Sequence, residues 1–105
     1  MMRYSKEQIK KELKRLEGWK LKGKEIWKIF KLENFIESIL FVTRMAALAE
    51  HYNHHPDILI KYDTVKLNLT THDEGGLTER DFNLAKHINK LESELHGRIH
   101  KSHDS

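Results

Sequence analysis

The sequence predicts an α+β fold, with a four-stranded antiparallel sheet and three helices packed on one face of it. Two observations lead to this prediction. Apolar residues recur at helical spacing in three separate segments, and two pairs of short strand-like segments lie between them. The resulting order is helix, two strands, helix, two strands, helix. Because the chain has 105 residues and no linker, repeat or low-complexity tract, we expect a single domain over residues 1–105.

The first helix and the first strand pair are marked by their turn residues. Ser5 and Gln8, three residues apart, form a capping box that starts a helix, and Gly18 suits its end. Residues 19–21 and 25–32 are then expected to be strands on either side of a glycine turn. Apolar residues occupy both faces of the second strand. We therefore expect both faces to be covered, one by helices and the other by a second subunit.

The second helix is expected to be the longest. Asn34 caps its start, and it ends near His54 because Pro56 disfavours helical geometry at the residue before it. Residues 57–62 and 65–71 follow as a hairpin. The alternation of apolar and polar residues in the second of these strands is typical of a sheet with one buried face.

The third helix follows a break in the chain at Gly75-Gly76. Thr78 and Asp81 stand at capping positions, and apolar residues then recur at helical spacing. We interpret Asp81 mainly as a helix cap. The tail after about residue 97 is polar and is expected to fray.

Composition excludes several classes of protein. The net charge is +3, with 19 basic and 16 acidic residues interspersed along the chain, so a nucleic-acid partner is not expected. The absence of cysteine excludes disulfides and thiolate metal sites. No segment approaches the roughly 20 apolar residues of a membrane span, and the first residues lack the apolar run of a signal peptide. We therefore expect a soluble, cytoplasmic protein with no membrane partner.

Three of the eight histidines are expected to meet. A strand over residues 57–62 runs about 20 Å away from His54 and His55, and its partner strand returns over a similar distance to His72. By strand parity, His72 lies on the face opposite the apolar row of its strand. The glycine pair then brings the start of the third helix to the same end. A structural or solvated role is expected for the remaining histidines of the third helix and tail, which are His87, His96, His100 and His103.

Three interpretations fit such a cluster of imidazoles. Histidine can give and take a proton near neutral pH because its ordinary pKa is about 6.5, which suits general acid–base catalysis. A metal site is the second, since His51 and Glu50 or Asp57 are potential further ligands. The side chains of adjacent histidines diverge, and no His-Glu-x-x-His pattern is present, which disfavours a metal. In the third, His54 and His55 merely cap the C-terminus of a helix.

Three sequence blocks carry a family resemblance, and they are Glu50 to Pro56, Thr70 to Asp73, and Gly76 to Asp81. In order and separation they resemble the signature of the pterin-4a-carbinolamine dehydratases. The resemblance implies an enzyme that removes water from a 4a-hydroxytetrahydropterin, giving the quinonoid dihydropterin, in tetrahydrobiopterin recycling. It also implies that the reaction uses no metal or other cofactor, and that the chain forms a homo-oligomer, either a dimer or a tetramer.

The resemblance also assigns residues to the site. It implies that His54, His55 and His72 are catalytic, with His55 and His72 sharing the proton transfers and His54 positioning or relaying. It implies a pterin-binding set of Asn53, Thr70, Thr71, Asp73, Glu50, Trp19 and Arg80. Many members carry aromatic residues where this chain has Ile58 and Leu59, so an aromatic wall is not expected there. The alternative function is a protein-interaction or dimerisation module with the same fold and a vestigial pterin pocket.

Overall fold

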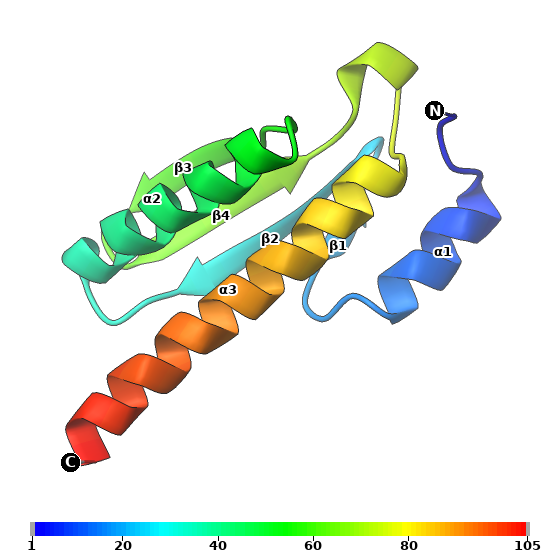
Figure 1. The fold of residues 1–105 in the computed structure, drawn as a ribbon. Helices are drawn as coiled ribbons and strands as arrows, with labels where there is room; N and C mark the ends of the chain where they lie inside the picture. The colour runs from blue at the N-terminus through cyan, green and yellow to red at the C-terminus, as the bar shows by residue number, and fades with distance from the viewer. Residues whose placement is uncertain (1, 105) are drawn as a thin grey trace.

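Three helices, four strands and one short 3-10 helix make up the computed structural model, which describes residues 2–104 and the side-chain surroundings of residues 2–95 (Figure 1). The helices are α1 (Lys6–Lys14), α2 (Phe35–His51) and α3 (Glu79–Asp104). The strands are β1 (Lys20–Lys22), β2 (Glu25–Lys31), β3 (Asp57–Lys61) and β4 (Thr64–Leu69), and η1 (His72–Glu74) is the 3-10 helix. The predicted α+β class is confirmed.

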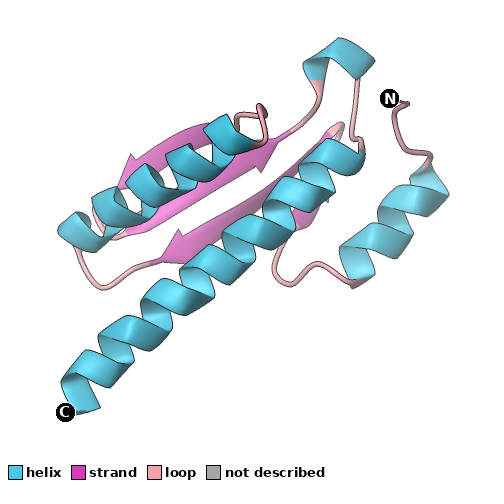
Figure 2. Ribbon diagram, in the orientation of Figure 1, coloured by secondary structure: helices cyan, strands magenta, loops and turns pink. Residues whose placement is uncertain are grey.

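The strands form one antiparallel sheet in the order β1-β2-β4-β3. β2 and β4 pair in the middle of the sheet, with Ile26 opposite Leu69. α2 and α3 lie across the same face of this sheet (Figure 2). α1 lies beside the first half of α3, where Glu12 and Lys86 form a 3.7 Å ion pair. The three helices therefore gather on one side, as the sequence predicts.

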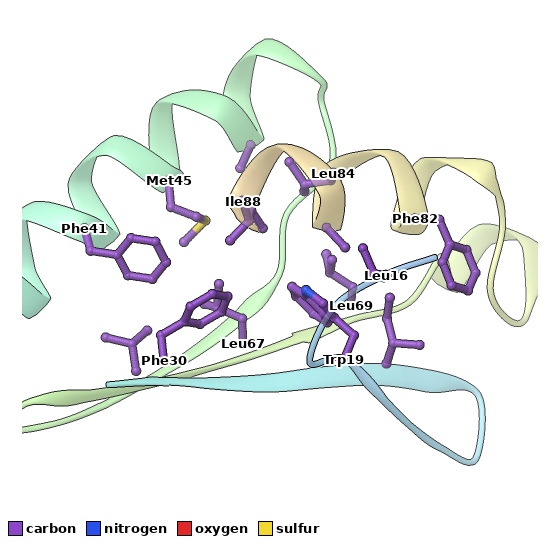
Figure 3. Close-up of a cluster of buried hydrophobic side chains, with 14 of the residues drawn as sticks. Leu16, Trp19, Phe30, Phe41, Met45, Leu67, Leu69, Phe82, Leu84 and Ile88 are labelled. Atoms are coloured by element: carbon purple, nitrogen blue, oxygen red, sulfur yellow. The ribbon is translucent and has the colours of Figure 1, made fainter. Parts of the chain in front are cut away.

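The core lies between the covered face of the sheet and the inner sides of α2 and α3 (Figure 3). Alternate residues of β2 and β4 point into it, because successive side chains of a strand lie on opposite faces. The buried side chains include Ile26 and Phe30 from β2, Val65, Leu67 and Leu69 from β4, Phe41 and Met45 from α2, and Leu84 and Ile88 from α3.

The other face of the sheet is not covered by the described residues. Ile29 is 53% exposed on it. Trp27 lies beneath two ammonium groups, those of Lys20 and Lys66, at 5.3 Å and 4.9 Å from its ring centroid. Within residues 2–95, helices therefore cover one face of β2 and leave the other to solvent. A second subunit over this face stays a prediction.

The capping residues predicted for the first two helices stand at the helix starts. The hydroxyl of Ser5 accepts from the backbone N–H of Gln8, and the Gln8 side chain accepts from the backbone N–H of Ser5 at 2.8 Å. The side-chain oxygen of Asn34 accepts from the backbone N–H of Glu37 at 2.9 Å. Each contact satisfies a backbone donor that the first turn of a helix leaves unpaired.

α3, with 26 residues, is longer than α2, with 17, so the expectation that the second helix is the longest is wrong. α3 continues in helical form past residue 96. The side chains of His96, His100 and His103 lie outside the described residues, so their solvated role and the fraying of the tail stay predictions. No helix within residues 2–104 combines the length and the apolar composition that crossing a bilayer requires.

A polar cluster ties β2 to α3 at the edge of the core. The ammonium of Lys28 donates to the backbone carbonyl of Glu17 at 3.1 Å and to Oδ1 of Asn89 at 2.9 Å. The indole N–H of Trp19 donates to the same oxygen at 2.9 Å. Burial lowers the pKa of Lys28 below its ordinary value, because the charged ammonium is partly removed from water.

Candidate active site

A pocket opens where α2 ends and α3 begins, and it has a volume of about 230 Å³. Its lining comes from three parts of the chain that are far apart in sequence. The lining residues are Asn53, His54 and His55 after α2, Thr70, Thr71, His72 and Asp73 after β4, and Arg80 on α3. All of them belong to the set that the sequence singles out, and the three histidines expected to meet do so here.

The backbone after α2 turns sharply to deliver the first two histidines. The N–H of His54 donates to the carbonyl of Ala49 at 3.0 Å, and the N–H of Asn53 donates to the carbonyl of Glu50 at 3.2 Å. Asn53 has a φ of 49°, in the left-handed region. This combination is a Schellman motif, which ends a helix and redirects the chain. α2 therefore ends at His51, slightly before the predicted end at His54.

The side chain of His54 is held by a buried carboxylate. Its Nε2 lies 2.6 Å from Oδ1 of Asp81, and the side-chain exposures are 8% for the imidazole and 0% for the carboxylate. The carboxylate can only accept, so Nε2 must carry the proton. No described residue hydrogen-bonds the other ring nitrogen, Nδ1, and the ring lines the pocket. His54 therefore has one nitrogen committed to Asp81 and the other available to a ligand.

Asp81 accepts hydrogen bonds at both of its carboxylate oxygens. Its Oδ2 accepts from the hydroxyl of Thr71 at 2.7 Å and from the backbone N–H of Thr78 at 2.9 Å. The two threonine hydroxyls are also 2.9 Å apart. A buried carboxylate needs such partners, because a charge removed from water without them is strongly unfavourable. The network joins the end of β4, the start of α3 and His54 into one unit.

The role of Asp81 is larger than the sequence indicates. Its contact with the N–H of Thr78 is the helix cap that we predict from the sequence. The same carboxylate also orients His54, which lies 27 positions earlier in the chain. The carboxylate of a helix cap normally faces solvent, so complete burial distinguishes Asp81 from an ordinary cap. This burial cannot be deduced from the sequence pattern, because it depends on the tertiary structure.

His55 is paired differently from its neighbour. Its Nε2 lies 2.5 Å from Oε2 of Glu50, one helical turn back, and both side chains are more than half exposed. An exposed pair of this kind contributes little to stability. It does restrict the orientation of the ring, so Glu50 acts on the pocket through His55 and does not itself line the pocket.

His72 is placed by a 3-10 turn and not by strand parity. β4 ends at Leu69, before the predicted end at residue 71, and η1 contains His72. Gly75 follows with a φ of 70°, which favours glycine, and Thr71 pairs with Gly76 across the turn. The predicted position of His72 beside His54 is correct, but the expectation that it lies on a strand face is wrong.

Arg80 joins the ends of the two helices. Its guanidinium donates to the backbone carbonyl of Asn53 at 2.5 Å, so the first turn of α3 holds the left-handed residue that follows α2. Trp19, in contrast, does not line the pocket. It lies in the core with Phe30 (Figure 3), and its partner Asn89 is nine positions beyond Arg80, or about 13 Å further along α3.

The remaining histidine of the described part of α3 has a structural environment. Nδ1 of His87 bonds the carbonyl of Asn83 at 2.8 Å, and the hydroxyl of Tyr52 lies 2.8 Å from Nε2. Both ring nitrogens are therefore engaged outside the pocket. In residues 2–95, no three His, Asp or Glu side chains are grouped closely enough to hold a metal ion, so the metal interpretation has no ligand set there.

Residues 2–91 match the protein family described as pterin 4 alpha carbinolamine dehydratase. The chain belongs to this family. A relative from Chloroflexus aurantiacus is 50% identical over 91 residues, which cover 87% of this chain and 98% of the relative. One from Sulfolobus acidocaldarius is 44% identical over 91 residues, covering 87% of this chain and 100% of the relative. Both are named provisionally as pterin-4-alpha-carbinolamine dehydratases.

Two solved structures have the same fold as this chain. A protein from Brucella melitensis, described as a transcriptional coactivator/pterin dehydratase, superposes with a TM-score of 0.81 at 32% identity, over 85% of this chain and 97% of its own. A pterin dehydratase-like protein, described as a RuBisCO assembly factor in the alpha-carboxysome, has a TM-score of 0.62 at 24% identity, over 72% of this chain and 90% of its own. The second likeness concerns the fold alone.

Proposed function

We propose that this chain is an active 4a-hydroxytetrahydropterin dehydratase that works by histidine general acid–base catalysis. The observation that carries the proposal is the meeting of His54, His55 and His72 on one pocket, in a chain of this family. A place for the reaction in cytoplasmic tetrahydrobiopterin recycling is part of the proposal and rests on the family alone.

The proposed reaction needs one proton donor and one proton acceptor. The C4a–O bond breaks, and the departing hydroxyl takes a proton and leaves as water. The lone pair of N5 forms the new C4a=N5 double bond, and N5 gives up its proton. No electrons are exchanged with another molecule, so two correctly placed imidazoles suffice. Each positioned acid–base group is expected to accelerate the reaction by about 10²–10⁴-fold.

The exposed histidines are the proposed proton carriers. His55 and His72 line the pocket and remain open to solvent, so each can regain its starting protonation state after a turnover. His54 is fixed by Asp81 and offers the pocket an orienting hydrogen bond or a relay. Imidazoles suit this work because their ordinary pKa lies close to neutral pH.

The pterin ring is proposed to bind through side chains around the histidines. The amide of Asn53 can donate and accept, and the carboxylate of Asp73 matches the N3–H and 2-amino donors of a pterin. The hydroxyl of Thr71 is already engaged by Asp81, and the guanidinium of Arg80 by Asn53. These last two side chains therefore support the shape of the pocket.

The test is the dehydration rate of freshly prepared 4a-hydroxytetrahydropterin, followed by ultraviolet absorbance. We expect the wild type to accelerate the reaction and His55→Ala or His72→Ala to lose 10²-fold or more, roughly the contribution of one acid–base group. His87→Gln is the matched control, because His87 lies outside the pocket with both nitrogens engaged. No acceleration by the wild type would refute the enzymatic proposal.

The alternative is an interaction module that uses the same fold. One observation favours it, namely that the Brucella melitensis relative is described as a coactivator as well as a dehydratase. An interaction surface does not need three imidazoles on one pocket, and so the intact histidine set supports the enzyme. If the wild-type chain is folded but neither binds a pterin nor accelerates the dehydration, the interaction module becomes the favoured function.

Self-association is the remaining part of the proposal, and the occupant we propose for the outer face of α2 is a second copy of this chain. The exposed apolar side chains there are Phe35, Ile36, Ile39 and Leu40, at 40–69% exposure. Thr43, Ala46 and Ala47 continue the stripe at helical spacing and are small enough for close helix packing. The outer face of α2 is therefore apolar, whereas the solvent-facing side of a helix on the surface of a monomeric protein is usually polar.

A further inference from the structure

His72 differs from the other two pocket histidines in how its ring is held. Asp81 fixes the imidazole of His54, and Glu50 fixes that of His55. No described residue forms a hydrogen bond with the imidazole of His72, and this residue is exposed. The position of the ring on the pocket therefore depends on the backbone of the turn that carries it.

The turn that carries His72 is closed by bonds among its own residues. The N–H of Thr71 donates to the carbonyl of Gly76 at 3.2 Å, and the N–H of Gly76 donates back to the carbonyl of Thr71 at 3.3 Å. Between them, the N–H of Gly75 donates to the carbonyl of His72 at 3.0 Å. These bonds join near neighbours in sequence, so contacts with distant segments must hold the turn in place. The bond from the Thr71 hydroxyl to Asp81 is one such contact, on the inner side of the turn.

The N-terminal segment supplies another contact. It runs beside the stretch of chain that joins η1 to α3 (Figure 1). The N–H of Tyr4 donates to the carbonyl of Leu77 at 2.7 Å, and the ring of Tyr4 stacks on the buried ring of Phe82, with the two centroids 5.7 Å apart. Ser5 then caps α1. Tyr4 is therefore fixed through both its backbone and its side chain, which places Arg3 next to the turn.

Arg3 packs on the two glycines of the turn. A Cβ on Gly76 would lie 3.3 Å from Cδ of Arg3 and 3.8 Å from its Cγ, and a Cβ on Gly75 would lie 3.6 Å from Nη1. The aliphatic stem of Arg3 thus covers Gly76, which is buried although it lies in a loop. Gly75 is favoured by its φ of 70°, whereas at Gly76 the close approach of Arg3 favours a residue without a side chain.

We propose that Arg3 is a positioning residue for His72. Its stem holds the turn over residues 71–76 against the fold, so that the imidazole of His72 stays beside the pterin. Arg3 does not line the histidine pocket, so it acts through the turn and takes no part in the proton transfers. This inference rests on the proposed function, in which His72 carries a proton. Placement matters for such a group, because a shift of about 1 Å can cost roughly 10²-fold in rate.

The first measurement is hydrogen exchange at the backbone N–H groups of Gly75 and Gly76, which requires no substrate. Both groups donate within the turn, so their exchange rates report how often the turn opens. We expect Arg3→Ala to raise both rates about tenfold, and Arg3→Lys, which keeps the stem through Cδ, to restore them. Arg15→Ala is the matched control, because Arg15 is an exposed arginine at the opposite end of α1. Exchange in Arg3→Ala at the wild-type rate would refute the inference.

The second measurement is kcat/KM for the dehydration, in single and double variants. Arg3→Ala should lower kcat/KM about tenfold, which is part of the roughly 10²-fold loss expected for His72→Ala. Arg3→Lys should restore it. In a His72→Ala background, Arg3→Ala should have no further effect, because Arg3 acts through this imidazole. Equal losses in both backgrounds, or faster exchange with an unchanged kcat/KM, would refute the positioning of His72.

The two measurements separate failure of this inference from failure of the proposed function. If the wild type accelerates no dehydration, the proposed function fails. Faster exchange in Arg3→Ala would still support the hold of Arg3 on the turn, because exchange needs no turnover. Normal wild-type activity with unchanged exchange in Arg3→Ala would refute the inference alone. Arg3 is exposed, so its alanine variant should unfold in urea at the same midpoint as Arg15→Ala, which excludes general destabilisation as the cause.

Discussion

The imidazole of His54 and the carboxylate of Asp81 share a 2.6 Å hydrogen bond inside the fold, between the end of one helix and the start of another. The Asp81 carboxylate is fully buried, and it also accepts from Thr71 and Thr78. Orientation of a ring in the pocket and capping of a helix therefore depend on the same carboxylate.

Removing the charge of Asp81 should reduce both stability and turnover. In Asp81→Asn, one acceptor oxygen becomes an NH₂ donor that faces the donors of Thr71, Thr78 or His54. We expect a loss of about 1–3 kcal/mol in the free energy of unfolding, the scale of an unsatisfied buried polar group. Urea unfolding measures it. The kcat of the proposed dehydration should also fall, because His54 loses the acceptor that orients its ring.

Asp73→Asn is the control for that prediction. It is the same substitution, but Asp73 lines the pocket and is exposed, whereas Asp81 is buried behind His54. Its effect on unfolding should stay within about 0.5 kcal/mol, as for most surface changes. Equal stability losses at positions 73 and 81 would contradict the role given to the buried network.

Asn53 allows its backbone role to be separated from its side-chain role. Its φ of 49° is unfavourable for a residue with a Cβ, but asparagine tolerates this region better than alanine does. Asn53→Gly should therefore match or exceed the wild type in unfolding free energy, and Asn53→Ala should lose about 1 kcal/mol. Both variants lack the amide, so equal falls in pterin binding would assign that binding to the side chain. Normal pterin binding by Asn53→Gly would remove Asn53 from the ring-binding set.

Lys28 should make stability depend on pH in the alkaline range. Burial lowers its pKa in the folded state, so between the folded and unfolded pKa values the unfolded chain holds the extra proton. The free energy of unfolding then rises with pH in this window, up to the unfolded value near 10.4. Relative to Lys28→Met, the wild type should gain stability as the pH rises toward the unfolded-state pKa near 10.4. A difference that is constant with pH would show that Lys28 titrates normally.

The apolar stripe on α2 predicts a change in oligomeric state. A lysine at Ile36 or Ile39 would place a charge where a second copy packs, so sedimentation velocity should show a smaller species than the wild type. Tyr62→Lys is the control, because Tyr62 is also exposed but lies in the β3–β4 turn. A wild type that is monomeric at micromolar concentration would refute self-association directly.

Much of this molecule follows from local sequence patterns. The alternation in β4 predicts which of its side chains are buried, because a strand has only two faces. The capping residues Ser5 and Asn34 predict two helix starts, because they act on the next few residues. The cluster of histidines follows from strand lengths, since a hairpin must return to its origin. These inferences need no knowledge of packing.

The features that the sequence does not predict depend on contacts between distant segments. A strand that continued to His72 would place this histidine on a face of the sheet. In the structure the chain leaves the sheet after Leu69 and forms a 3-10 turn closed by Thr71 and Gly76. The bond from Arg80 to Asn53 and the burial of Asp81 also depend on how two helices meet. A sequence pattern names the residues in such contacts but not their partners.

Because Asp81 both orients His54 and caps α3, its loss would affect the stability of the fold as well as the pocket. A substitution that removes the Asp81 carboxylate also weakens the start of α3. Such a variant would unfold more easily, so selection for a folded protein would act against it. His55 and His72 are exposed and hold no part of the core. In relatives that keep the fold but lack the proposed dehydratase activity, we therefore expect His55 and His72 to be substituted first. Asp81 should remain in such chains after the pocket has become inactive.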